Sequence, residues 1–90
     1  MERLLLVEDD PTLIRMLSSF LVSEGFAVTP VTGQTAAKEE MERQRPDLAL
    51  VDISLTEGNG FGVCACAKER GIPVIFLTAS GDEYSVVTGL

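Results

Sequence analysis

The sequence contains no histidine, and only two of its 90 residues are cysteines. Without an imidazole, histidine base catalysis and histidine ligation of a metal ion are excluded. The cysteines, Cys64 and Cys66, are separated by one residue. On a helix this spacing would point them about 200° apart, a poor geometry for sharing a zinc ion or forming a disulfide. We therefore expect two free thiols, as is usual in a reducing cytoplasm.

Long apolar runs are missing as well. No run approaches the ~20 residues that a membrane-spanning helix needs. The apolar residues that follow Glu2 and Arg3 are too few for the core of a signal peptide. Ninety residues allow one small domain. We expect residues 1–90 to form a single domain that lies in the cytoplasm and has no membrane partner.

Basic residues are also scarce. Seven lysines and arginines stand against fourteen aspartates and glutamates, which gives a formal net charge of −7. An acidic chain repels nucleic acid and attracts cations or basic partners. We therefore expect no nucleic-acid binding by this chain itself.

What the sequence does contain is a regular alternation of short apolar runs and amphipathic stretches. Asp10 can cap a helix, and Pro11 suits its first turn because its missing N–H would be unpaired there. Gly25 is a natural stop for that helix. Pro30 places the second apolar run at a sheet edge, since proline cannot donate to a central ladder. The pattern predicts strands over residues 4–7, 26–31, 48–51 and 73–77, and helices over residues 11–24, 34–44, 61–70 and 82–90.

Alternating strands and helices indicate βαβ units, and hence an α/β fold with a parallel sheet covered by helices on both faces. In such a sheet, ligands gather outside the carboxyl ends of the strands, where the strand order switches. Glu8 and Asp9 directly follow the first predicted strand, Asp52 follows the third, and Thr78 follows the fourth. If the first and third strands are neighbours, these side chains converge on one crevice.

Carboxylates held close together repel one another, by about 4 kcal/mol for two unit charges ~4 Å apart in an effective dielectric near 20. A raised pKa or a bound divalent cation relieves this repulsion. Oxygen ligands suit Mg²⁺, whereas a zinc site usually needs histidine or paired thiolates. An aspartate beside Mg²⁺ can act as a nucleophile and form an aspartyl phosphate. A hydroxyl such as that of Thr78 could then donate to a phosphoryl oxygen.

Each of these residues also has a structural explanation. Asp10 suits a helix N-terminus, Asp52 could cap nearby N–H groups in a loop, and Thr78 could be a turn hydroxyl. The glycines around Asn59 do not match a dinucleotide-binding or phosphate-binding loop. An aspartyl-phosphate hydrolase of another α/β family is a further alternative. Such enzymes usually have two acids spaced D-x-D after one strand, and residues 8–10 do not provide that spacing.

In combination, the motifs resemble those of the receiver domains of two-component response regulators, over the whole chain. The similarity lies in LLLVEDDP at residues 4–11, VDISL at 51–55, Gly60 eight residues after Asp52, and FLTA at 76–79. The resemblance implies a flavodoxin-like fold, in which the strand order is 2-1-3-4-5. In this chain we expect the order 2-1-3-4, with the family's fifth strand and fifth helix absent.

By position, the resemblance implies that Asp52 accepts a phosphoryl group from a histidine kinase, a phosphotransfer protein or a small acyl phosphate. Glu8 and Asp9 would bind Mg²⁺, Asp9 more directly. Asp52 and the backbone carbonyl of Ser54 would complete the protein ligands. The chain would be a phosphoacceptor rather than an enzyme, with at most self-catalysed phosphorylation and dephosphorylation.

The resemblance further implies that Thr78 and the N–H of Ala79 contact the phosphoryl group. Three departures from the family pattern stand out, and the first is that Glu8 lies where the family usually has aspartate. Thr56 lies where the family usually has proline. The lysine and the aromatic residue of the family's fifth strand are missing, because we expect that strand to be absent. The chain's two lysines, Lys38 and Lys68, lie in predicted helices and cannot replace the missing one. An open edge on the fourth strand would favour self-association. The alternative function is therefore an assembly module that pairs through this edge without phosphotransfer.

Overall fold

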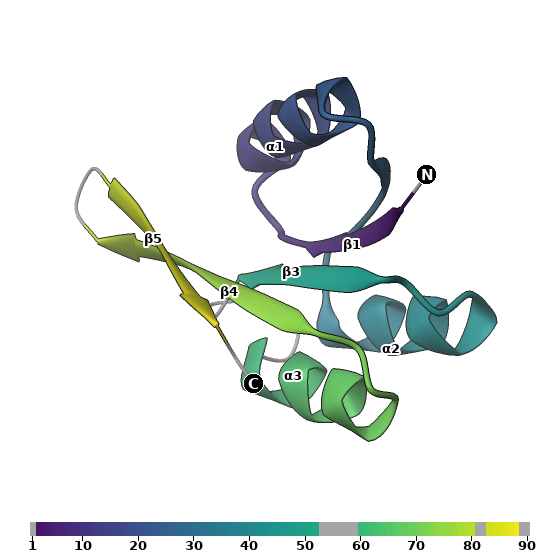
Figure 1. Ribbon diagram of the computed structural model, residues 1–90. Helices are drawn as coiled ribbons and strands as arrows, with labels where there is room; N and C mark the ends of the chain where they lie inside the picture. The colour runs from purple at the N-terminus through teal and green to yellow at the C-terminus, as the bar shows by residue number, and fades with distance from the viewer. Residues whose placement is uncertain (1, 53–59, 81–82, 89–90) are drawn as a thin grey trace.

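The computed structural model describes residues 2–52, 60–80 and 83–88 (Figure 1). Within these residues, five strands form one sheet, and three helices connect the first four of them. The strands are β1 (Arg3–Val7), β2 (Ala27–Val31), β3 (Leu48–Asp52), β4 (Val74–Ser80) and β5 (Glu83–Thr88), and the helices are α1 (Pro11–Ser23), α2 (Gln34–Arg43) and α3 (Gly60–Glu69).

The strand order is β2-β1-β3-β4-β5. The first four strands are parallel, with Val7 beside Val51 in the centre of the sheet and Asp52 beside Leu77. Helix α1 covers one face, and α2 and α3 lie together on the other (Figure 1). The predicted α/β fold and the order 2-1-3-4 are confirmed. Pro30 lies on the edge strand β2, as expected of a residue that cannot donate to a central ladder.

Local sequence signals set the ends of α1. The Asp10 side chain is the N-cap and accepts hydrogen bonds from the backbone N–H groups of Thr12 (2.9 Å) and Leu13 (3.5 Å). Pro11 occupies the first turn, where no N–H partner is needed. The chain leaves the helix at Gly25 with φ +96°, a conformation that side chains with a Cβ rarely adopt. These three residues start and stop the helix within one residue of the prediction.

The C-terminal part of the chain differs from the prediction. Residues 82–90 were expected to begin a helix, but Glu83–Thr88 form β5, which pairs antiparallel with β4. The physical reason is composition: Tyr84, Val86, Val87 and Thr88 belong to the aromatic and β-branched types that favour a pleated strand. Because β5 is antiparallel, it differs from the parallel fifth strand that the resemblance implies.

The same pairing changes the end of β4. This strand was expected to stop at Leu77, but it continues to Ser80. Thr78 lies opposite Ser85, and Ala79 lies opposite Tyr84. The edge of β4, which the sequence suggested would be open, is therefore occupied by β5.

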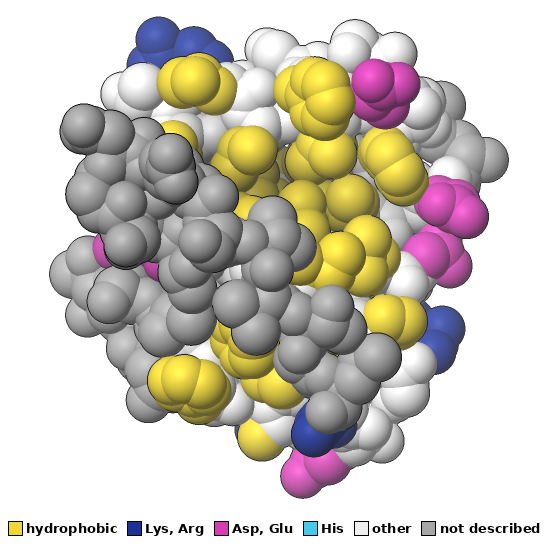
Figure 2. Space-filling view, turned by 60° about the vertical axis from the view of Figure 1, so that its left-hand side comes forward, with side chains coloured by type: hydrophobic (Ala, Val, Ile, Leu, Met, Phe, Trp, Pro, Cys, Tyr) yellow, Lys and Arg dark blue, Asp and Glu magenta, His cyan; other side chains and the backbone are white. Residues whose placement is uncertain are grey.

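The two faces of the sheet are buried to different extents. On the side of α2 and α3, twelve residues form a buried core that includes Val7, Val51 and Met41. On the side of α1, the buried residues among those that the structure describes are Leu4, Leu6 and Leu77, and α1 itself contributes only partly buried side chains such as Leu17 and Leu21. Figure 2 shows a broad patch of hydrophobic side chains that is visible on the surface of the molecule, below α1 in this view. The stability of the fold therefore rests mainly on the core beneath α2 and α3.

Two smaller features complete the fold. Cys64 is buried and Cys66 is partly buried, and neither forms a disulfide, as predicted. Helices α2 and α3 approach closely at Gly62, where an added Cβ would come within 3.0 Å of the side-chain amide of Gln34. Among the described residues, no helix has the length and apolar character needed to cross a membrane.

Candidate metal centre

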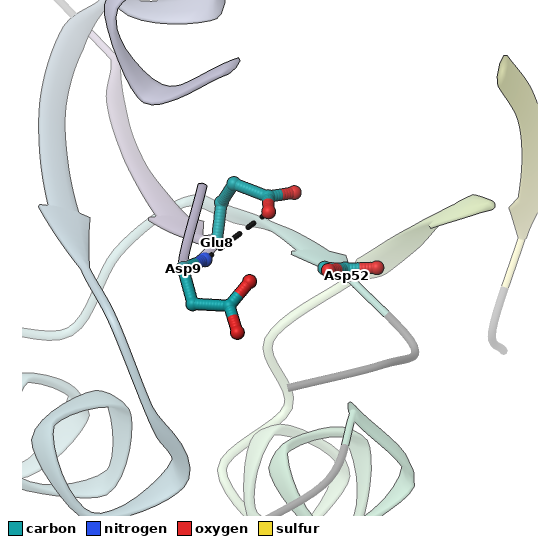
Figure 3. A group of neighbouring side chains, drawn as sticks. All are labelled: Glu8, Asp9 and Asp52. Atoms are coloured by element: carbon teal, nitrogen blue, oxygen red, sulfur yellow. Dashed lines mark hydrogen bonds between the residues drawn. The ribbon is translucent and has the colours of Figure 1, made fainter. Parts of the chain in front are cut away.

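Two neighbouring strands bring three carboxylates together at one edge of the sheet. Glu8 and Asp9 directly follow β1, and Asp52 is the last residue of β3, the neighbour of β1. One carboxylate oxygen from each of the three lies within 4.8 Å of the others. Figure 3 shows the three carboxylates gathered around a common space. The convergence that the sequence predicted for these acids is therefore present.

Glu8 is the buried member of the group. Only 2% of the residue is exposed, whereas Asp9 and Asp52 are half-buried. Its oxygen Oε1 accepts hydrogen bonds from the backbone N–H groups of Asp9 and Asp10, both at 3.1 Å (Figure 3 shows the first). Its own N–H donates to the carbonyl of Val31 on β2 at 3.0 Å. These contacts hold both the backbone and the carboxylate of Glu8 in place.

The surroundings of Glu8 raise the pKa of its carboxyl from 4.5 to about 7. The largest cause is burial, which removes the charged form from water. The negative charges of Asp52 and Asp9 raise the pKa further, and the two backbone hydrogen bonds oppose the rise because they favour the carboxylate. A cation bound at this carboxyl would therefore have to compete with a proton near neutral pH.

The donor set fits a hard divalent cation. Mg²⁺ binds oxygen at 2.0–2.1 Å in an octahedron, so ligands on opposite sides of the ion are about 4.2 Å apart. Three carboxylate oxygens within 4.8 Å of one another can surround one such ion after small side-chain rotations, with water in the other positions. A double positive charge would also offset the repulsion among Glu8, Asp9 and Asp52. The residues present therefore suit Mg²⁺.

The remaining predicted site residues are placed as follows. Asp52 pairs with Leu77, so the backbone of Thr78 lies one residue further along the same edge of the sheet, followed by Ala79. Ser54 lies outside the described residues. Asp10, the third acid of the triplet, is not part of the carboxylate group and caps α1 instead.

The sequence analysis missed one contribution to the site. The backbone N–H groups of Asp9 and Asp10, just before α1, hold the buried carboxylate of Glu8. A helix N-terminus attracts anions because its first N–H groups lack partners within the helix. The signal was present in the sequence: Glu8 precedes Pro11, the first residue of α1, by only three positions.

Comparisons with known proteins agree on one family. The profile of the response regulator receiver domain matches residues 4–90. The DNA-binding response regulator MtrA of Mycolicibacterium smegmatis is 39% identical over 90 residues, which cover 99% of this chain and 40% of MtrA. The regulatory protein VanRc of Enterococcus gallinarum is 33% identical over 90 residues, which cover 99% of this chain and 39% of VanRc. The chain thus spans about two fifths of the length of these relatives.

Solved structures agree. The signal receiver domain of a modulated diguanylate cyclase from Desulfovibrio desulfuricans is 34% identical, with a TM-score of 0.83 over 91% of this chain and 68% of that one. The receiver domain of a sensor histidine kinase from Pseudomonas aeruginosa is 32% identical, with a TM-score of 0.82 over 91% of this chain and 70% of that one. Sequence and structure together show that the chain belongs to the response regulator receiver domain family.

Proposed function

We propose that the chain is the phosphoacceptor module of a two-component response regulator. It would take a phosphoryl group on Asp52 from a histidine kinase or a phosphotransfer protein, in a reaction that requires Mg²⁺. The observation that carries this proposal is the position of Asp52 beside Glu8 and Asp9 at the carboxyl edge of β1 and β3. The similarity to response regulators supports it, as does the related receiver domain solved with a magnesium ion in its active site cleft.

Asp52 is the acid best placed to be the nucleophile. It is only half-buried, so one oxygen can meet a phosphoryl donor, whereas Glu8 is fixed and almost wholly covered. In the transfer, an oxygen of Asp52 forms a bond to phosphorus. The phosphorus–nitrogen bond of a phosphohistidine, or the phosphorus–oxygen bond of an acyl phosphate, breaks and leaves its electron pair on the donor. A bound Mg²⁺ would neutralise charge on the transferring group and orient it.

The other residues have supporting roles in this proposal. Glu8 and Asp9 hold the ion, with Asp9 the more accessible of the two. Asp52 and the backbone carbonyl of Ser54 supply further ligands. Thr78 and the N–H of Ala79 contact the phosphoryl oxygens. The chain is a phosphoacceptor rather than an enzyme, and it acts in the cytoplasm, which suits two cysteines that form no disulfide.

Phosphorylation of the isolated chain tests the proposal. The chain is incubated with acetyl phosphate and Mg²⁺, and its intact mass is measured. We expect a gain of one phosphoryl group that is lost when Mg²⁺ is chelated and is absent in Asp52→Asn. Asp10→Asn is the matched control: it removes a neighbouring acid but keeps a good N-cap, so it should still be phosphorylated. A wild-type chain that binds Mg²⁺ yet gains no mass would overturn the proposal.

The alternative of an assembly module that pairs through an open β4 edge is not favoured. Strand β5 occupies that edge from Ile75 to Ser80.

A further inference from the structure

We draw no further inference here: the strongest candidate, the patch of exposed apolar side chains that Met16, Phe20 and Val22 form on α1, carries nothing because no contact among the residues that the structure describes shows what covers it.

Discussion

A carboxylate oxygen of Glu8, a residue only 2% exposed, lies within 4.8 Å of a carboxylate oxygen of Asp52. The two residues come from neighbouring parallel strands, so the sheet itself fixes their separation. Burial of Glu8 and the charge of Asp52 both disfavour the ionised form of Glu8. We therefore expect the stability of the protein to respond to protons, to divalent cations and to any change of charge at position 52.

The stability of the cation-free protein should fall as the pH rises toward neutrality. The pKa of Glu8 is about 7 in the folded protein and near 4.5 when unfolded, so the folded state binds the proton more tightly. Its contribution is complete below pH 4.5, is lost as the pH rises to about 7, and is absent above. The full contribution is about 3 kcal/mol. Urea unfolding with a chelator between pH 5 and 8 measures this loss.

Glu8→Gln is the control for that titration, because the amide oxygen can keep the hydrogen bonds from Asp9 and Asp10. The difference in unfolding free energy between the variant and the wild type should change steadily from pH 5 to about 7. A difference that stays constant across this range would contradict the raised pKa.

Asp52→Asn should stabilise the protein when no divalent cation is present. At pH 8 the wild-type chain holds Glu8, Asp9 and Asp52 ionised together, and asparagine removes one of the three charges. We expect the free energy of unfolding to rise by about 1 kcal/mol, since the residues are partly screened by solvent. Millimolar Mg²⁺ should stabilise the wild type more than the variant.

Thermal unfolding with and without Mg²⁺ measures both effects of Asp52→Asn. Asp10→Asn removes an acid outside the carboxylate group and serves as the comparison. If Mg²⁺ stabilised the two variants equally, Asp52 would not be a ligand of the ion.

Asp10→Ala should destabilise the protein through α1. The side chain of Asp10 accepts hydrogen bonds from two N–H groups of the first turn, and alanine leaves both without this partner. A lost N-cap costs about 0.5–2 kcal/mol. Denaturant unfolding gives the value, and Asp10→Ser should recover most of the loss because serine is also a good N-cap. If serine and alanine were equally destabilising, capping would not be the cause.

Gly62→Ala should loosen the contact between α2 and α3. The new Cβ would lie under 3.0 Å from the side-chain amide of Gln34, so that flexible side chain has to move. We expect any loss to be small, because the end of a flexible side chain moves at little cost and alanine is favoured over glycine in a helix by about 1 kcal/mol. A double-mutant cycle with Gln34→Ala tests the cause, since the cost of Gly62→Ala should shrink once the amide is removed. A cost that does not depend on residue 34 would assign the effect to α3 alone.

The sequence predicted the central part of the molecule well because its signals are local and agree with one another. Asp10, Pro11 and Gly25 mark the ends of α1, and Pro30 marks an edge strand. The acids after β1 and β3 converge because β1 and β3 are adjacent, a placement that follows from the parallel α/β pattern. The sequence could not show the burial of Glu8, because the residues that shield a side chain from solvent are known only from the packed structure.

The C-terminal prediction failed for a different reason. Residues 82–90 were assigned to a helix by continuing the alternation of strands and helices, although Val86, Val87 and Thr88 favour an extended chain. Pairing with β4 adds a non-local interaction that no short sequence window contains. The roles of Thr78 and Ala79 stay predictions, and Ser54 lies outside the described residues.

The absence of buried residues in α1 has a consequence for local unfolding. Strand β1 is almost wholly covered, with Leu6 and Val7 at 0% exposure, while α1 can leave the sheet with little loss of the core beneath α2 and α3. Helix α1 should therefore open at a lower free energy than the rest of the protein. The N–H groups that hold the Glu8 carboxylate belong to Asp9 and Asp10, which directly precede α1. A cation bound by the carboxylates would therefore oppose this opening. Binding of a cation to the carboxylate group would then slow the opening of the whole of α1.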